Sequence, residues 1–254
     1  MTSIIFLGRV FPLKPGMTVR KHPPIAVQDQ HSDFTMLFDI SIRDGQITVD
    51  CDVENYSHDK HYISCLVRAI DLVNASVNLL AFKMGLGVTV VIERSIEEDG
   101  SHRAISLRDL LLGSLVTAFS PDDESFDVVL EFVFQDLRLS RAIRDLTESI
   151  GGPHLIPTNC ARAIETIRSI MLPANVDRKL GWKYLRDNLR ATEGYIKLIT
   201  DNGVGPRHGD LQYVAGDVTR VIATRSWILM TRFFEYLKRG KQPLPLADFP
   251  ILSE

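Results

Sequence analysis

The clearest pattern of hydrophobic and polar positions lies between residues 34 and 53. Apolar side chains occupy every second position on both sides of Asp44-Gly45. This alternation is typical of strands with one buried face, and the Asp-Gly pair favours a two-residue type I′ turn. The turn sets a register in which every apolar pair lies on the same face. We therefore predict a β-hairpin with the cross-strand pairs Arg43–Gln46, Ile42–Ile47, Ile40–Val49, Phe38–Cys51 and Met36–Val53.

Two further strands and a long helix complete the predicted N-terminal part. Residues 3–8 and 87–94 carry short apolar runs typical of strands. Between the hairpin and the second of these strands, apolar side chains recur at helical spacing from Ile63 to Met84. Gly85 then favours the end of the helix. A long helix packed on a mostly antiparallel sheet is the simplest arrangement of these elements.

From residue 106 onward, the start and stop signals of helices dominate. Ser106 with Asp109 resembles a capping box for a helix that ends near Phe119. Residues 120–124 combine a cap, a proline and three acids, which favours a second helix up to Gly151. The run 126–137 also fits strand alternation, but these start signals favour a helix. Three more helices are predicted near 159–171, 176–201 and 211–239, capped by Thr158, Asn175 and Asp210, and Gly203 and Gly240 follow the last two.

These elements predict an α+β protein, with an N-terminal antiparallel sheet and a long packed helix, followed by a C-terminal antiparallel helical bundle. We assign residues 1–120 to the first domain, 121–239 to the bundle and 240–254 to an extended tail that contacts the surface through Phe249 and Ile251. Charge supports two modules: residues 1–150 hold 14 Lys and Arg against 22 Asp and Glu, and residues 151–254 hold 15 against 10. The boundary falls at either 120–125 or 151–157.

Composition narrows the class of protein. The chain has 254 residues, of which 45% are hydrophobic and 24% charged, and such proportions exclude disorder and low-complexity architecture. Three widely spaced cysteines without a Cys-x-x-Cys pair exclude a disulfide framework. The stretch 110–119, taken as the most apolar, is shorter than the roughly 18 residues of a membrane span. We expect a soluble cytoplasmic protein that uses no metal, cofactor or membrane.

Two N-terminal clusters suggest weaker hypotheses. The hairpin register places Asp39 opposite Asp50, with Asp52 one step along, and like charges there favour a cation or a basic partner. A solvated sheet face is the favoured alternative. His58 and His61 precede Cys65 at helical spacing, but a metal site needs three or four converging ligands. A buried thiol and two ordinary histidines are the favoured interpretation.

The segment 202–210, Asn-Gly-Val-Gly-Pro-Arg-His-Gly-Asp, joins the last two predicted helices and carries the most suggestive chemistry. His208 precedes a helix N-terminus, where free amides favour an anion, and histidine transfers protons near neutral pH. Arg207 supplies a planar cation suited to phosphate. The alternative is that His208 and Asp210 only cap the helix while the arginines are solvated. The residues of this candidate anion-binding or nucleic-acid-binding groove are Arg207, His208, Asp210, Arg186, Arg190, Arg220 and Arg225, with Arg232 and Arg239 further along the last helix.

Residues 158–239, with long antiparallel helices and an Arg/His turn before the last of them, resemble a HEPN domain. HEPN domains are helical bundles, often dimeric, that occur in toxins, defence systems and RNA-processing proteins. The resemblance implies a metal-independent ribonuclease in which His208 handles the 2′-hydroxyl proton and Arg207 stabilises the phosphorane. The family motif separates its arginine and histidine by roughly four to six residues, whereas here they are adjacent. Non-catalytic members, which bind partners or nucleotides, are the closer comparison.

Three functions therefore remain. The first is a binding protein whose basic helical module engages RNA, a nucleotide or an acidic protein partner. The second is a structural or assembly protein in which the basic half docks on the acidic half. The third is a HEPN-type endoribonuclease with Arg207 and His208 as catalytic residues. We expect a homodimer, and core packing rather than base stacking for the C-terminal aromatic residues, which are Trp182, Tyr184, Tyr195, Tyr213, Trp227, Phe233, Phe234 and Tyr236.

Overall fold

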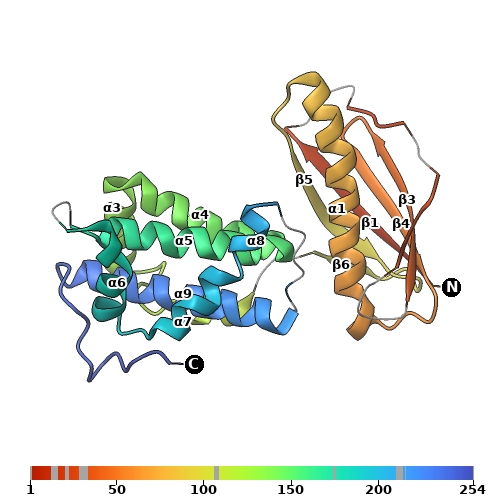
Figure 1. Cartoon of the computed structure of the whole chain (residues 1–254). Coiled ribbons are helices and arrows are strands. Elements are labelled where there is room, and N and C mark those ends of the chain that lie inside the picture. Colours follow the sequence, from red (N-terminus) through yellow and green to blue (C-terminus); the bar gives the residue numbers. More distant parts are fainter. Residues whose placement is uncertain are drawn as a thin grey trace. The chain divides into compact units, whose positions relative to one another are not determined.

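The computed structural model describes residues 2–12, 17–20, 23–28, 34–105, 109–173, 176–209, 214 and 216–253, without the side chains of residues 59, 153 and 206. It confirms the α+β class: an antiparallel sheet with a long helix is followed by a helical region (Figure 1). Two compact units are present, Met1–Ser106 and Leu107–Glu254. The second unit begins before the expected boundaries because Leu112 and Ala118 belong to the helical core.

The first unit is a six-stranded antiparallel sheet with the strand order β2-β3-β4-β1-β5-β6. The central strand β1 pairs with β4 on one side and with β5 on the other. The strands predicted at 3–8 and 87–94 correspond to β1 and β5. The six strands are β1 (Thr2–Phe11), β2 (Ile25–Gln28), β3 (Thr35–Arg43), β4 (Gln46–Val53), β5 (Thr89–Ile96) and β6 (His102–Ala104).

The predicted hairpin is confirmed together with its register. Strands β3 and β4 pair with Arg43 opposite Gln46, and all the predicted apolar pairs follow. Asp44 and Gly45 have φ values of 50° and 76°, the positive values that a type I′ turn requires. The same register places Asp39 opposite Asp50, as expected.

Helix α1 (His58–Met84) packs on the sheet and ends where the sequence predicts (Figure 1). Val73 and Val77 are fully buried in the core that the helix shares with the strands. Gly85 follows the helix with φ of 64°, and its N–H bonds to the carbonyl of Phe82. Glycine adopts this left-handed conformation at low cost, which explains the sharp stop.

Part of α1, Lys60–Met84, is long and apolar enough to cross a membrane by length and composition alone. This segment is longer than residues 110–119, the apolar stretch from which we expected that the chain does not cross a membrane. The core helix of a soluble protein meets the same criterion. The helix has two sides: Val73 and Val77 are buried on the sheet, while Leu79 and Phe82 are 71% and 87% exposed.

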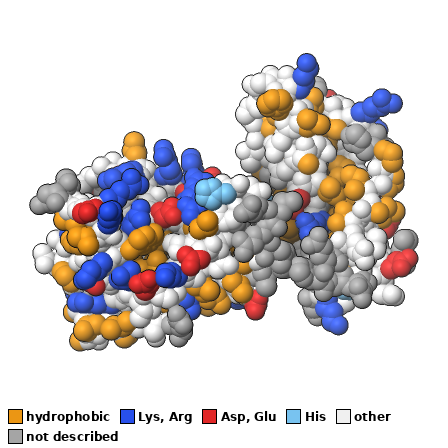
Figure 2. Space-filling model, in the orientation of Figure 1, with side chains coloured by type: hydrophobic (Ala, Val, Ile, Leu, Met, Phe, Trp, Pro, Cys, Tyr) orange, Lys and Arg blue, Asp and Glu red, His pale blue; other side chains and the backbone are white. Residues whose placement is uncertain are grey.

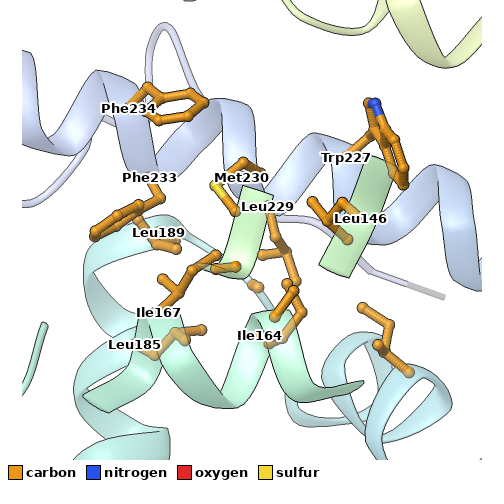
Figure 3. Close-up of a cluster of buried hydrophobic side chains, with 14 of the residues drawn as sticks. Leu146, Ile164, Ile167, Leu185, Leu189, Trp227, Leu229, Met230, Phe233 and Phe234 are labelled. Atoms are coloured by element: carbon orange, nitrogen blue, oxygen red, sulfur yellow. The ribbon is translucent and has the colours of Figure 1, made fainter. Parts of the chain in front are cut away.

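The second unit is helical, and α9 contacts most of its other helices. Side chains of α9 such as Leu229 and Phe233 pack with Ile164 of α5 and Leu185 of α6 in one hydrophobic core (Figure 3). The elements are α2 (Leu110–Ser114), α3 (Glu124–Gln135), α4 (Leu137–Gly151), α5 (Ile156–Met171), α6 (Gly181–Leu189), α7 (Glu193–Asp201), α8 (Val204–Arg207) and α9 (Gly216–Lys238), with 3-10 turns at Pro153–Leu155 and Arg178–Leu180.

Two predicted helix starts are shifted. Asp109 caps α2 by accepting a hydrogen bond from the Leu112 N–H at 3.0 Å, and α2 ends well before Phe119. Ser106 lies outside the described residues. Asp123, rather than Ser120, caps α3 through the Ser125 N–H. In the second segment, Asp123 competes with Ser120 for the free amides of the first turn.

Two predicted long helices are each divided. Asp136 ends α3 and caps α4, so the helix predicted up to Gly151 is two helices. Arg190 adopts a left-handed φ of 58° after α6, and Thr192 then caps α7. Thr158 lies inside α5, which has Pro157 in its first turn. The predicted caps Asn175 and Asp210 lie outside the described residues.

The tail after α9 packs on the second unit, as expected. Leu244 is fully buried, and Phe249 is partly buried against the helical core. Leu252 forms a parallel bridge with Ala191. The expected anchor Ile251 is instead 58% exposed, so Leu244 and Phe249 hold the tail.

Candidate anion-binding site

Arg207 and His208 lie at the end of α8, a short helix within the predicted turn. The backbone N–H of His208 bonds to the Gly205 carbonyl at 2.9 Å, and its side chain is exposed. The guanidinium of Arg207 donates to Glu165 Oε2 at 2.6 Å and to the Gly203 carbonyl at 3.0 Å. Arg207 is therefore directed toward α5. Asp210, the third residue predicted at this turn, lies outside the described residues.

The other arginines of the predicted groove occupy different surroundings. Arg186 lies 3.7 Å from Glu193, and Arg220 is exposed on α9. Arg225 stacks over the ring of Tyr195 at 4.6 Å and donates to its carbonyl at 3.3 Å. These contacts support the packing between helices.

Three of these arginines hold the C-terminal tail against the helices. Arg190 donates to the Leu244 carbonyl at 2.6 Å. Arg232 is buried, and it donates to the carbonyls of Leu189, Arg190 and Pro250 at 2.8–3.0 Å. At the end of α9, Arg239 lies over the ring of Phe249 at 5.3 Å. Their guanidinium groups are therefore engaged in structural contacts.

A different group of arginines lines an open pocket of about 350 Å³ between α4, α5 and the turn Arg178–Leu180. Figure 2 shows many Lys and Arg side chains, interspersed with Asp and Glu, on the visible face of the second unit. On both helices the lining positions recur three, four or seven residues apart, which places them on one side of each helix. The lining residues are Arg138, Arg141, Asp145, Arg162, Glu165, Thr166, Arg168, Ser169 and Arg178.

Asp145 is the buried anchor of this arginine pocket. Its side chain is only 2% exposed, and Arg162 lies 3.0 Å from its Oδ1. Burial raises the pKa of Asp145, because a carboxylate loses hydration there, and the charge of Arg162 opposes this increase. The ion pair orients Arg162 along the wall of the pocket.

Arg168 is held by packing. Its guanidinium lies over the ring of Trp182 at 4.5 Å. Burial lowers the pKa of Arg168, the charge of Glu165 opposes this effect, and the nearby Arg178 adds to it. An anion between these two cations would stabilise both of them.

Three of the lining cations have no acidic partner close by. Arg141, Arg168 and Arg178 form no ion pair within 4 Å with the residues that the structure describes. Five arginines face only two acids in the pocket, so its net charge is positive. Planar guanidinium groups bind phosphate and carboxylate through paired hydrogen bonds, and the pocket is therefore suited to an anion.

We did not predict this pocket from the sequence. The available signal is the spacing of charged residues. Arg138, Arg141 and Asp145 lie three and four residues apart on α4, and Arg162 and Glu165 lie three residues apart on α5. Such a polar stripe is also common on solvated helix faces, so only the packing of α4 against α5 distinguishes it. The predicted Arg207 is not one of the lining residues, but it forms an ion pair with Glu165, which is.

The predicted histidine cluster of the first unit forms a polar network. His58 Nδ1 lies 3.1 Å from the Tyr56 hydroxyl and 3.3 Å from Glu97, and its Nε2 lies 3.2 Å from Arg103. His61 Nδ1 accepts the N–H of Ser57 at 3.0 Å. Among the described residues, no three His, Cys, Asp or Glu side chains are grouped to hold a metal ion.

Comparison with known proteins identifies a family. No match was found among curated proteins or among solved structures. Residues 4–106 match the model of the N-terminal domain of DUF8168, a domain of unknown function, and residues 126–238 match the model of its C-terminal domain. The two matches correspond to the sheet unit and to most of the helical unit, and together they span most of the chain. The chain therefore belongs to the DUF8168 family.

Proposed function

We propose that this protein binds a phosphate-bearing ligand, a nucleotide or RNA, at the arginine pocket between α4 and α5. The observation that carries the proposal is a set of three arginines around one pocket, Arg141, Arg168 and Arg178, that form no ion pair with an acid among the described residues. The volume of about 350 Å³ lies within the usual range of small-ligand sites, roughly 300–1,000 Å³.

The chemistry of the lining favours phosphate over other anions. A phosphate group offers several oxygens in different directions, and guanidinium groups from two helices and a turn approach from different directions. Arg162 is already oriented by Asp145, so its hydrogen bonds need little further ordering. Arg207 pairs with the lining residue Glu165, and Arg207 and its neighbour His208 remain proposed contacts for a longer ligand such as RNA.

The experiment is a binding titration with the full chain in excess EDTA. One arm uses a fluorescent adenine nucleotide, and the other uses end-labelled single-stranded RNA. The variants are Arg141→Gln and Arg178→Gln, with Arg144→Gln as the matched control, because Arg144 lies on α4 but pairs with Glu148 outside the pocket. We expect the first two variants to weaken binding roughly tenfold and the control to retain wild-type affinity.

The two arms separate the sources of phosphate. Binding of the nucleotide alone assigns a mononucleotide site, and binding of RNA with a steep salt dependence assigns an RNA backbone site. If neither probe binds at low salt, or if Arg144→Gln weakens binding as much as Arg141→Gln, the proposal fails. Denaturing lanes of the RNA arm also test the ribonuclease hypothesis, which requires cleavage that His208→Ala abolishes.

A further inference from the structure

Three helices of the second unit turn apolar stripes toward one common space. The positions on α9 and α3 follow the spacing i, i+3, i+4, i+7, and those on α4 follow i, i+3, i+4. This spacing defines one side of a helix. The stripes are Trp227, Met230, Thr231 and Phe234 on α9, Phe126, Val129, Leu130 and Val133 on α3, and Ile143, Leu146 and Thr147 on α4.

The stripes do not fill the space between them. They enclose, together with Val116 and Phe119, a partly open cavity of about 360 Å³. Protein interiors normally pack without voids larger than a water molecule, so this volume is unusual between three amphipathic helices. We call it the apolar cavity.

The two threonine hydroxyls of the lining are already engaged with the backbone. Thr231 Oγ1 donates to the Leu115 carbonyl at 3.2 Å, and Thr147 Oγ1 donates to the Arg144 carbonyl at 3.1 Å. Water inside such a cavity finds few hydrogen-bond partners, and its replacement by an apolar group is favourable. No charged side chain belongs to the lining, all of which the structure describes.

The cavity lies at one edge of the helical core, because Val129, Leu146 and Met230 belong to both. Leu229 and Phe233 of α9 pack toward α5 and α6, whereas Trp227 and Phe234 point away from Leu185 and the other α6 side chains (Figure 3). Leu229 and Phe233 therefore lie on a side of α9 that does not line the cavity. The cavity is also distinct from the arginine pocket, with which it shares no lining residue.

We propose that the apolar cavity binds an uncharged alkyl or ring compound of roughly ten to twelve non-hydrogen atoms, each occupying about 30 Å³. The lining chemistry sets the ligand class, since a charged group inside would lose its hydration without a partner. A polar end group of the ligand remains at the mouth, beside the exposed Thr147. The proposal does not depend on phosphate binding.

The test uses the full chain and a series of 1-alkanols from butanol to tetradecanol. Their binding is measured by displacement of the uncharged fluorophore 1-aminoanthracene. We expect affinity to rise roughly fourfold for each added methylene and to level off near ten to twelve carbons, where the cavity is full. The chain length at which affinity stops rising is measured on the wild-type protein alone, so this test does not require a variant.

Two substitutions on α3 form a matched pair. Val133→Phe places a ring in the cavity, and it should reduce decanol affinity at least tenfold while the melting temperature stays equal or rises. Val128→Phe adds the same volume on the exposed side of α3, where the valine is 43% exposed, and should leave binding unchanged.

Three outcomes would overturn the proposal. Decanol could bind wild type and Val133→Phe equally, which would place it elsewhere on the surface. Affinity could increase steadily past fourteen carbons, which would indicate partition onto an open apolar face. Wild type could fail to bind any alkanol yet form a dimer that Val133→Phe dissociates, which would assign the cavity to a contact between copies of the chain.

Discussion

Arg207 donates to Glu165 Oε2 across 2.6 Å, and this ion pair joins α8 to α5 at the edge of the arginine pocket. The guanidinium expected to meet a phosphate is thus partly neutralised by a carboxylate. A ligand that reaches Arg207 has to compete with Glu165. Under the proposed function, the pair would therefore reduce the contribution of Arg207 to anion affinity.

Glu165→Gln should strengthen binding of the phosphate probe. The change removes a negative charge from the pocket and releases Arg207, so we expect affinity to rise roughly threefold to tenfold at low salt. Glu148→Gln makes the same change of net charge in an exposed pair with Arg144 and serves as the control. Equal gains in both variants would show a general charge effect and contradict a local role for Glu165.

Asp145 should make the protein less stable as the pH rises. Burial raises the pKa of this carboxyl above its ordinary value of 3.8, so the folded state binds its proton more tightly than the unfolded state. The free energy of unfolding therefore falls between 3.8 and the raised value, because the buried group must ionise. Urea unfolding of wild type and Asp145→Asn from about pH 3 to pH 7 checks this effect. The difference in stability between the two proteins should shift in favour of the variant as the pH rises, and a constant difference would refute it.

Arg232→Met should release the C-terminal tail. Three backbone carbonyls lose their donor in a buried site, which costs about 2–4 kcal/mol of unfolding free energy. Limited proteolysis should then cleave near Pro250 before the helices are attacked. Arg220→Met, on the exposed side of the same helix, should change stability by less than about 0.5 kcal/mol. Intact tail contacts in Arg232→Met would mean that Leu244 and Phe249 suffice.

Gly203→Ala should destabilise the contact between α8 and α5. A Cβ at Gly203 would lie 2.5 Å from the Cβ of Ala161 and 2.7 Å from the carbonyl of Pro157, so backbone has to move. We expect a loss of about 1–3 kcal/mol in thermal or urea unfolding. At Gly216, where a Cβ meets nothing within 4 Å, alanine should be neutral or stabilising. A neutral Gly203→Ala would mean that α8 shifts freely.

Gly85 and Gly203 together show which features a local sequence signal predicts and which it does not. The predicted end of α1 at Gly85 is confirmed. A glycine directly after the last apolar position of a helix is a local signal, because glycine adopts the positive φ of a helix stop. Gly203 was assigned the same role, but it is buried against α5 and is needed for close approach. Contacts between distant segments have no signature in the residues beside the glycine.

The hairpin and the caps illustrate the same limit. Alternation and the Asp44-Gly45 turn determine the register of β3 and β4 because both act within a few residues. Asp136 and Thr192 divide helices that the apolar spacing alone would continue. Both residue types are favoured at the N-cap, but the apolar spacing continues on both sides of them, so the sequence pattern alone does not predict a new helix there.

The candidate site was predictable only in part. Arginine and histidine in a glycine-rich turn point to anion chemistry, and the only link of Arg207 to the arginine pocket among the described residues is its ion pair with Glu165. The arginines that line the pocket belong to α4, α5 and a 3-10 turn, so their proximity depends on helix packing. Nothing in the sequence distinguishes Arg190 and Arg232 from the arginines that line the pocket, yet both donate hydrogen bonds to backbone carbonyls of the tail.

The position of α9 near the end of the chain has a consequence for synthesis on the ribosome. The sheet and α1 form one continuous segment that leaves the ribosome before the second unit, and the strands and helix that share its core are then present. The helices of the second unit emerge next, but their core lacks the side chains of α9 until α2–α8 have all been made. Nascent α3–α7 therefore expose apolar surface for longest, and this interval is when the protein most needs chaperones.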